Sequence, residues 1–303
     1  MTDTPSNHTL AAGGTVLVYA LLIGFTDNFV RLIAADVGLW QFHAMRTAMA
    51  AALFVLAARP LRLRLAARDT RALALRSAIH AGAMLIYFGC LAFLSVAQTA
   101  AGLFTAPIFV LIFSRFWFGH ALGPVRIAAV ALGFLGVVLV LQPGADSPLG
   151  WASLLPVGAG ALYALGNLAT REWCPQESAA AMTLGFFLAL GVAGVAGLAG
   201  LALWHPAVPA GAEGFILRGW VLPNGQVLFW TFVQAAGSMV AVGCMVKAYQ
   251  LAEASRVSIF EYVILPISAA WSWFLWGETI AAVAWVGMGL IVAAGVMIAV
   301  RGR

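Results

Sequence analysis

Three charged residues lie inside long apolar stretches of the sequence, where they are the first candidates for chemistry. Asp27 and Arg46 lie in the first two of these stretches, and Glu261 lies near the start of the stretch that contains Pro266. A charge in such surroundings is costly, and it either pairs with an opposite charge or faces a wet cavity. A carboxylate placed in this way can bind a cationic group or exchange a proton. The residues therefore indicate binding or ion coupling, and we expect no catalytic residue and no metal site.

Asp27 and Arg46 have two interpretations. They form either a charge pair that a substrate or a proton perturbs, or a fixed structural bridge near one membrane surface. Arg31, one helical turn beyond Asp27, is a competing partner for the same carboxylate.

Glu261 also has two interpretations. It can couple transport to protons, because burial and neighbouring charges control whether such a carboxylate is ionised. It can also form a salt bridge at the rim of the membrane, with Lys247 or Arg256 as the partner. The sequence leaves both open.

Uncharged polar and aromatic residues recur at helical spacing in the same stretches. Positions 80, 84 and 87 fall on one helical face, as do positions 234 and 238. A cavity with apolar and aromatic walls and few polar anchors is the usual site for a small organic ligand. Such residues also join transmembrane helices by hydrogen bonds, and that alternative stays open for each. The predicted substrate-binding residues are Asn28, His80, Met84, Tyr87, Asn167, Gln234, Ser238 and Trp271.

The elements that carry these residues have the composition of membrane spans. Of 303 residues, 63% are hydrophobic and 9% are charged, and the mean hydropathy is +0.98. Helices satisfy their own backbone hydrogen bonds in lipid. We therefore predict an all-α polytopic membrane protein with ten transmembrane helices, at 13–33, 39–58, 76–96, 98–118, 125–142, 150–170, 179–203, 227–247, 257–276 and 280–300.

Basic residues are divided unequally between the two sides of these spans. Thirteen of the sixteen Lys and Arg residues fall on the side of the N-terminus, Arg31 and Arg218 fall on the other side, and Arg46 lies inside a span. Because basic loops stay in the cytoplasm, we predict a cytoplasmic (inner) membrane protein with both termini cytoplasmic. The one long loop, 204–226, then lies outside, where we expect it to cover the exit without gating it.

The two halves of the sequence resemble each other at a shift of 159 positions. Pro107 then meets Pro266, and residues 136–140 meet residues 295–299. Five spans per half invert the second unit relative to the first, a design that recurs in secondary transporters with a site between the units. The predicted organisation is two inverted five-helix repeats, at 13–146 and 147–303, after a polar cytoplasmic segment at 1–12.

Short motifs over nearly the full length carry a resemblance to a known family. They comprise a Gly-containing first helix in each half, an arginine pattern in the second helix, a turn into a Pro-bearing fourth helix, and Gly-Glu before the last helix. The first-helix motif is residues 24–28 and Gly166-Asn167, and the arginine pattern is residues 45–50. The turn into the Pro-bearing helix is residues 97–107 and 254–266, and the final motif is Gly277-Glu278. The first half departs from the pattern with Gly119-His120. The sequence resembles the drug/metabolite transporter superfamily, specifically the ten-helix exporters built from two EamA-type repeats.

The resemblance implies a small-molecule transporter, often an exporter of amino acids or other metabolites. We expect a secondary active transporter that works by alternating access and exports such a metabolite. The alternatives are an uptake or exchange carrier for a vitamin, nucleobase or other organic solute and, with less support, a polytopic membrane enzyme. The expected partners are the substrate, the lipid bilayer and protons, with no cofactor, and the expected state is a monomer or weak homodimer.

Other classes have little support in the sequence. The formal charge is +5, yet the basic residues lie between spans and form no single patch with interleaved aromatic residues, so we expect no nucleic-acid binding. Cys90, Cys174 and Cys244 are scattered and indicate neither a disulfide framework nor a metal site.

Overall fold

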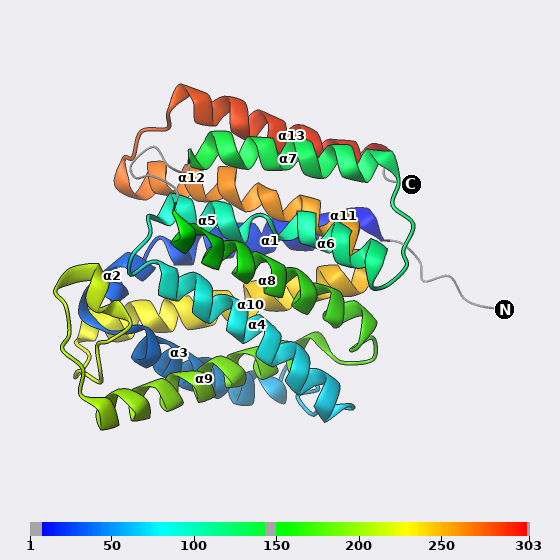
Figure 1. Ribbon diagram of the computed structural model, residues 1–303. Helices are drawn as coiled ribbons and strands as arrows, with labels where there is room; N and C mark the ends of the chain where they lie inside the picture. The colour runs from blue at the N-terminus through cyan, green and yellow to red at the C-terminus, as the bar shows by residue number, and fades with distance from the viewer. Residues whose placement is uncertain (1–7, 143–149, 302–303) are drawn as a thin grey trace.

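The computed structural model describes residues 8–142 and 150–301. These residues contain helices and loops and no strand, and ten segments among them are long and apolar enough to cross a membrane. The spans lie side by side, and both ends of the chain lie at one end of the bundle (Figure 1). The predicted all-α fold with ten membrane-length helices is confirmed. Residues 1–7, the predicted junction at 146 and 147, and Arg303 lie outside the described residues.

In the described residues, thirteen α-helices make up the ten spans. In chain order they are α1 (Thr9–Asp27), α2 (Val30–Asp36), α3 (Leu39–Ala58), α4 (Thr70–Cys90), α5 (Val96–Leu103), α6 (Ala106–Phe116), α7 (Pro124–Leu141), α8 (Leu154–Glu172), α9 (Ala179–Trp204), α10 (Gly225–Leu251), α11 (Ala254–Phe260), α12 (Ile264–Trp276) and α13 (Ala282–Arg301). Short 3₁₀ turns occur at Trp151–Ser153, Gly211–Phe215 and Glu261–Val263.

Three spans are broken within their length, which the hydropathy pattern does not predict. The first span breaks between α1 and α2, the fourth between α5 and α6, and the ninth between α11 and α12. In the last two, Pro107 and Pro266 lie in the first turn of α6 and α12. A proline has no N–H to donate to the residue four positions earlier, so an uninterrupted helix would leave the carbonyl of Leu103 or Tyr262 without its donor.

The third span begins earlier than predicted. Asp69 caps α4, and its carboxylate accepts hydrogen bonds from the backbone N–H groups of Arg71 and Ala72, each at 3.0 Å. Arg76 therefore lies inside the helix, where it is 2% exposed. The sequence predicts Arg76 as the first residue of the third span, and this boundary is wrong because the cap at Asp69 begins the helix at Thr70.

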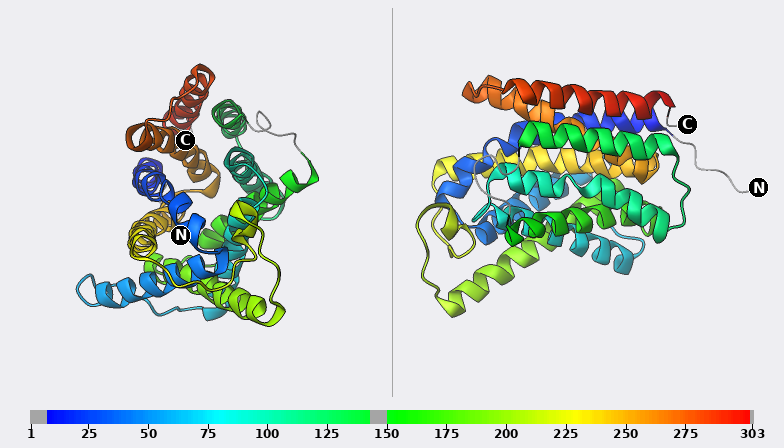
Figure 2. Two further views of the ribbon diagram at one scale, coloured as in Figure 1. Left: turned by 90° about the vertical axis from the view of Figure 1, so that its left-hand side faces the viewer. Right: turned by 45° about the horizontal axis from the view of Figure 1, so that its top comes forward.

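The most extensive helix contacts join one half of the chain to the other. α1 packs on α10 and α12, and α4 and the α5–α6 pair pack on α8. α3 packs on α9, and α7 packs on α13 (Figure 2). Each of these contacts has a counterpart when helices in equivalent positions of the two halves are exchanged. Contacts within the first half are sparse by comparison, so the two halves are interleaved.

The α7–α13 contact is a close backbone approach. A Cβ atom added to Gly136 would lie 2.6 Å from the carbonyl oxygen of Gly287, and one added to Gly287 would lie 2.6 Å from the carbonyl oxygen of Gly136. Small residues allow such approaches between membrane helices. On the other side of the molecule, a Cβ on Gly194 of α9 would lie 2.7 Å from the carbonyl oxygen of Trp40 in α3. These glycines therefore join the two halves.

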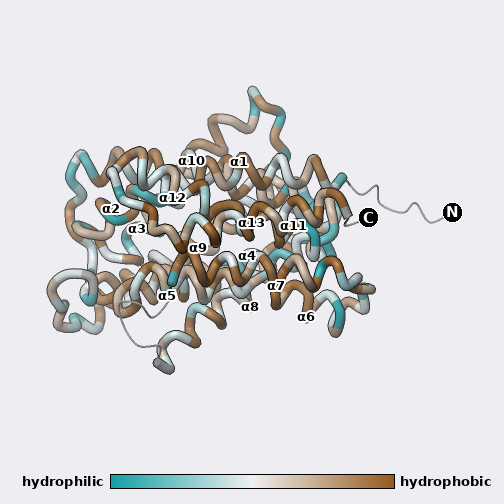
Figure 3. Tube along the Cα trace, turned by 90° about the horizontal axis from the view of Figure 1, so that it is seen from above, coloured by the Kyte–Doolittle hydropathy of each residue, from teal (hydrophilic) through white to brown (hydrophobic). Residues whose placement is uncertain are grey.

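Hydrophobic residues dominate the middle of the bundle and polar residues gather toward its two ends (Figure 3). We call the end that holds both chain termini the terminal end. There, the loop 59–69 meets the turn 173–178 of the other half. The buried carboxylate of Glu177 accepts hydrogen bonds from the backbone N–H groups of Arg68 and Asp69, at 2.6 and 2.7 Å. We call this pair of segments the terminal clasp.

A second pair of segments, the opposite clasp, lies at the other end of the bundle. The loop 205–224 is joined to residues 34–41 by a two-way hydrogen bond between the Gln41 side chain and the Val221 backbone, at 2.7 and 2.9 Å. The guanidinium of Arg218 also donates to the carbonyl groups of Ala34 and Ala35. Each clasp joins the loop after the second span of one half to the segment between the first two spans of the other.

The long loop also explains why one shift does not align the whole chain. α3 begins 140 positions before α9, whereas α5 begins 158 positions before α11. The loop 205–224 between α9 and α10 is longer than the loop 59–69 between α3 and α4. The shift of 159 positions therefore holds only for the last three spans of each half.

Candidate functional site

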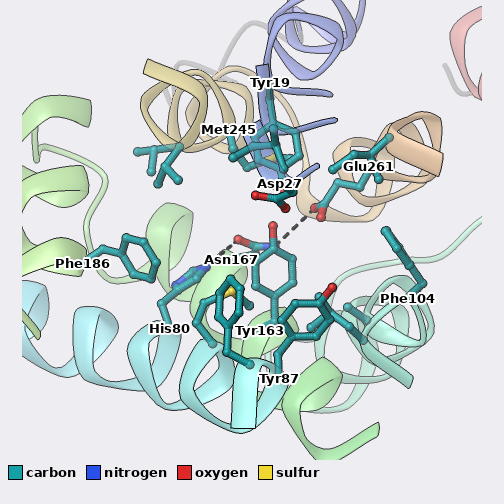
Figure 4. Close-up of a pocket in the computed structure, with 18 of the residues that line it drawn as sticks. Tyr19, Asp27, His80, Tyr87, Phe104, Tyr163, Asn167, Phe186, Met245 and Glu261 are labelled. Carbon is teal, nitrogen blue, oxygen red and sulfur yellow. Dashed lines mark hydrogen bonds between the residues drawn. The ribbon is translucent and has the colours of Figure 1, made fainter. Parts of the chain in front are cut away.

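A cavity lies between the two halves near the middle of the spans (Figure 4). Its walls come from α1, α3, α4, α5, α6, α8, α9 and α10, from the break between α11 and α12, and from the first residue of α12. No described residue of α7 or α13 lines it. Most of the lining is apolar or aromatic and a few polar groups are interspersed, as in a site for a small organic ligand.

Eight of the eleven residues predicted for binding or coupling line this one cavity, although they come from separate parts of the sequence. Whether they bind a substrate remains a prediction. They are Asp27, Arg46, His80, Met84, Tyr87, Asn167, Gln234 and Glu261.

The other three predicted residues do not line the cavity. The amide oxygen of Asn28 accepts hydrogen bonds from Ser272 and Trp276 and so joins α12 to the break after α1. Ser238 donates to the carbonyl of Gln234 one turn earlier in α10, at 2.5 Å. The indole N–H of Trp271 donates to the carbonyl of Leu21, at 3.1 Å. For these three, the alternative of hydrogen bonding between or within helices describes their contacts.

Glu261 lies in the broken ninth span and is 6% exposed. Its carboxylate accepts hydrogen bonds from the hydroxyl of Tyr249 and from the side-chain amide of Asn167, the latter at 3.3 Å. The amide oxygen of Asn167 in turn accepts from Nε2 of His80, at 2.9 Å (Figure 4). These donors compensate in part for removing the carboxylate from water. A polar chain thus runs from α4 through α8 to the break between α11 and α12.

Glu261 has polar partners inside the bundle in place of the rim salt bridge that the sequence left open as an alternative. Arg256 lies against the carboxylate of Glu253, at 3.4 Å, which also receives Arg126 at 2.5 Å. Lys247 is exposed. The broken span directs the Glu261 side chain into the bundle, toward Asn167 and away from these cations.

Asp27 and Arg46 line the same cavity without forming a direct ion pair in the described structure. Gln234 Nε2 donates to Asp27 Oδ1 at 3.3 Å, and Arg46 Nε donates to Ser238 Oγ at 3.3 Å. Gln234 and Ser238 are one turn apart on α10. Of the two interpretations that the sequence left open, the structure shows no direct bridge between these two residues, and α10 connects them indirectly.

Arg31 does not compete for Asp27. Its guanidinium pairs with Glu278 at 3.0 Å and lies over the Trp276 ring, 3.9 Å from the ring centroid. Both members of this ion pair are about half exposed, at 50% and 52%. The pair joins α2 to the segment after α12 at the surface, away from the cavity.

Arg76 is a cavity residue that the sequence reasoning missed. It donates from Nε to Thr170 Oγ1 and from Nη1 to the carbonyl of Met182, both at 3.0 Å. These partners belong to α8 and α9, so Arg76 joins the first half to the second. The missing signal was the helix cap at Asp69, which starts the helix at Thr70 and moves Arg76 from the end of the span into its interior.

Several aromatic rings of the cavity were also missed. Tyr163 lies four positions before Asn167, a spacing that places both on one face of α8. That spacing is a signal in the sequence from which Tyr163 could have been predicted as a cavity residue. Tyr19, Phe104 and Phe186 have no comparable signal, because each is one of many aromatic residues in apolar stretches.

Local packing fixes the position of His80. A Cβ atom on Gly166 would lie 2.2 Å from His80 Nδ1, so the imidazole occupies the space that a side chain at position 166 would fill. Asn167, the next residue of α8, then receives the hydrogen bond from Nε2. The Gly-Asn pair noted in the sequence thus seats and orients the histidine.

The described residues contain no group of three or more His, Cys, Asp or Glu side chains that could hold a metal ion. The arrangement offers two carboxylates, two guanidinium groups, amides, hydroxyls and aromatic faces. These groups are suited to recognising an organic molecule through hydrogen bonds and ring contacts.

The fold and cavity define a class, the ten-span membrane proteins with a central cavity between two interleaved halves. Residues 12–142 match the EamA-like transporter family. This match and the ten spans confirm the resemblance found in the motifs. The first half of the chain is thus similar to the EamA-like transporters of the drug/metabolite transporter superfamily.

Two relatives and one solved structure illustrate the similarity. A riboflavin transporter from Rhizobium johnstonii is 30% identical over 208 residues, which are 69% of this chain and 63% of the relative. The alignment thus spans less than two thirds of that protein. The pseudopaline exporter CntI of Pseudomonas aeruginosa is 22% identical over 283 residues, 92% of this chain and 93% of the relative. A crystal structure of a protein that is 17% identical covers 98% of this chain and 99% of its own, with a TM-score of 0.75, and this likeness concerns the fold alone.

Proposed function

We propose that this chain is a secondary active transporter that moves a small organic molecule across the cytoplasmic membrane by alternating access. The observation that carries the proposal is the cavity itself, which lies midway along the spans and takes polar groups from both halves. Binding at the midplane between two halves is the arrangement expected when one site is exposed to each side in turn.

The architecture supports two inverted five-helix repeats, at 13–146 and 147–303. α1 and α8 run in opposite directions through the bundle, and so do α7 and α13 (Figure 1). The two clasps join equivalent segments at opposite ends. Alternating access would follow if one clasp opens while the other stays closed. Most basic residues lie at the terminal end, which favours cytoplasmic termini.

Riboflavin is the first substrate to test. The support is the 30% identity to a riboflavin transporter, together with the aromatic rings of Tyr19, Tyr87 and Tyr163 around the cavity. A planar heteroaromatic ring gains contact area against such walls. Uptake of a vitamin therefore takes precedence over the export of an amino acid that the family resemblance alone implied.

The test is uptake of radiolabelled riboflavin into proteoliposomes that contain the purified full-length chain. We expect saturable, time-dependent accumulation that unlabelled riboflavin inhibits, and no accumulation in liposomes without protein. Uptake indistinguishable from that of the empty liposomes would reject riboflavin as the substrate. The same vesicles loaded with unlabelled riboflavin would report exchange, which separates transport from surface binding.

Export of an amino-acid-like metabolite is the second candidate. The pseudopaline exporter is less similar, at 22% identity, but its alignment covers 92% of this chain. A panel of amino acids as competitors in the same vesicles tests this candidate. Because a carrier is reversible, the direction in the cell depends on the gradients and on the coupling ion, so liposomes identify the substrate first.

A further inference from the structure

We propose that Asp27, Arg46 and Gln234 form a subsite for the imide edge of a planar heteroaromatic substrate, that is, a ring N–H flanked by two carbonyl groups. The proposal rests on the proposed transport function and names the part of the substrate that this site recognises. All three residues line the cavity, and each comes from a different span.

Arg46 is held in place by groups that leave its outer nitrogens available. Its Nε donates to Ser238 Oγ at 3.3 Å. The guanidinium carbon lies 5.0 Å from the ring centroid of Phe187 and 5.7 Å from that of Phe42. The side chain is 4% exposed and lines the cavity. A guanidinium carries five N–H donors, and Nε supplies one of them, so the terminal nitrogens can donate to a ligand.

Asp27 can accept hydrogen bonds from a ligand, whereas Arg46 donates them. Asp27 ends α1, and its side chain is exposed where it faces the cavity. The hydrogen bond from Gln234 uses one lone pair of Oδ1. A carboxylate has about four acceptor positions, so Asp27 can accept a further donor from the cavity. Gln234, which is 1% exposed, has a second amide N–H beyond the one given to Asp27.

Opposite charges in one low-dielectric cavity attract strongly. Here the contacts of Arg46 with Ser238, Phe42 and Phe187 hold the guanidinium in place, and the two charges do not meet directly. A ligand edge that joins them must place a donor toward Asp27 and acceptors beside it. An imide edge does this, with its N–H on the carboxylate and its carbonyl oxygens on Arg46 and Gln234. Hydrogen bonds to charged partners are the strong ones.

The walls next to this subsite favour a flat ring. Tyr87 and Phe88 follow each other on α4, with ring centroids 5.2 Å apart, and both line the cavity. A zwitterionic amino acid could also satisfy both charges, through its ammonium and carboxylate groups. It would not require the aromatic surface that surrounds them, and the imide is therefore the better fit. The amino acid is an outcome that the experiment can detect.

The first arm of the experiment changes the ligand and leaves the protein as it is. Unlabelled riboflavin, N3-methylriboflavin and phenylalanine compete with radiolabelled riboflavin for uptake into proteoliposomes. Methylation of the ring N–H removes the donor to Asp27, and we expect half-inhibition to require about tenfold more compound or more, the equivalent of about 1.4 kcal/mol. Equal competition by the two flavins would overturn the subsite while leaving riboflavin transport intact. Inhibition by phenylalanine at lower concentration than riboflavin would assign the charges to an amino acid.

The second arm changes the protein. In Asp27→Ala we expect the two flavins to compete equally, because the group that distinguishes them is gone. Glu213→Ala, which removes an exposed carboxylate in the loop 205–224, should keep the wild-type discrimination. Retained discrimination in Asp27→Ala would overturn the assignment. A complete lack of riboflavin uptake by the wild type would instead reject riboflavin as the substrate, so the two failures are distinguishable.

Discussion

Two carboxylates line the cavity in different surroundings. Glu261 receives hydrogen bonds from Tyr249 and Asn167, whereas Asp27 receives one from Gln234 and faces the cavity. In a medium of low dielectric constant, a carboxylate responds strongly to the gain or loss of a neighbouring charge or proton. We therefore expect these two residues to be the places where substrate binding and proton exchange influence each other.

Neutralising these carboxylates separates coupling from binding. We expect one of the two variants, Asp27→Asn or Glu261→Gln, to remove the group that exchanges the proton. That variant should lose the pH dependence of uphill transport and should still exchange substrate across the vesicle membrane. Uphill uptake should fall about tenfold or more, since a carrier that cannot exchange the proton equilibrates only its substrate. Transport is measured in proteoliposomes at a series of pH values, with monodisperse elution as the folding check.

Glu213→Gln is the control for this comparison, because Glu213 is exposed in the loop 205–224. Wild-type rates and an unchanged pH profile in both cavity variants would place the coupling elsewhere. Uncoupled facilitated exchange would then be the better account of transport.

The close packing of His80 against Gly166 gives a second test at the level of a residue. We expect Gly166→Ala to destabilise the protein by about 1–3 kcal/mol, as overpacking does, because its Cβ would lie 2.2 Å from His80 Nδ1. Gly158→Ala on the same helix has no atom within 4 Å of the added Cβ and should cost little. Thermal unfolding in detergent compares them, and equal midpoints would contradict the packing described here.

At the scale of elements, each end of the bundle has a clasp that joins the two halves. The terminal clasp depends on Glu177, which accepts the backbone N–H groups of Arg68 and Asp69, while Gln250 donates to the Glu177 carbonyl. The opposite clasp depends mainly on Gln41, Val221 and Arg218. In this structure the hydrogen bonds of both clasps are formed, and each joins segments from different halves.

Removal of the Glu177 carboxylate should loosen the terminal clasp. Glu177→Ala leaves two backbone N–H groups without their acceptor, at a cost of about 1–3 kcal/mol for each that stays buried. We expect a longer and broader distance distribution between spin labels at Leu61→Cys and Pro175→Cys in a cysteine-free background. Glu172→Ala, which removes a nearby carboxylate paired with His120 at 3.6 Å, should leave the distance unchanged. The same distribution in both variants would show that Glu177 does not hold the clasp.

The sequence predicts the helices whose bounds follow from hydropathy, and it misses the breaks and helix ends that depend on contacts between residues. The second span, 39–58, has the same bounds as α3. Gly38 precedes its first residue, and at its other end the apolar stretch stops at Arg59. The breaks within spans lie inside stretches whose average hydropathy stays high, although Asp27 and Glu261 lie at two of them. Pro107 and Pro266 follow the second and third breaks. The start of α4 depends on a cap at Asp69, which a hydropathy average cannot detect.

The site is predictable to the extent that polarity inside a span is rare. Asp27, Arg46 and Glu261 are conspicuous for that reason, and helical spacing adds His80, Met84 and Tyr87. Which polar residues face the cavity depends on the rotation of each helix. Ser238 and Gln234 share a face of α10, yet only Gln234 lines the cavity. Rotation follows from packing across the halves, which one sequence does not reveal.

At the scale of the whole molecule, orientation is the property that remains to be measured. The described basic loops lie mainly at the terminal end, so we expect both termini in the cytoplasm. Cysteines introduced between residues 59 and 69 should react with an impermeant thiol reagent only in inside-out vesicles, and cysteines between residues 205 and 224 only in intact cells. Labelling of 59–69 from outside the cell would invert the assignment.

The three native cysteines should interfere little with this measurement. Cys90 and Cys174 are buried. Burial raises the pKa of the Cys174 thiol, which lies in the turn after α8, against a smaller opposing effect of Arg76. Less of the reactive thiolate is then present at neutral pH. The wild-type protein, labelled in parallel, gives the background.

The interleaving of the halves also determines the order in which the protein can assemble. A ribosome releases α1 first, but the main neighbours of α1 are α10 and α12. The main partners of α3, α4 and α7 are α9, α8 and α13, which are all synthesised later. The last of them, α13, is the last helix to be made. A nascent chain that has reached residue 142 therefore consists of five spans with few contacts among them, held in the bilayer as separate helices. Assembly of this protein is a late event in its synthesis, and loss of the last span would leave α7 without its partner.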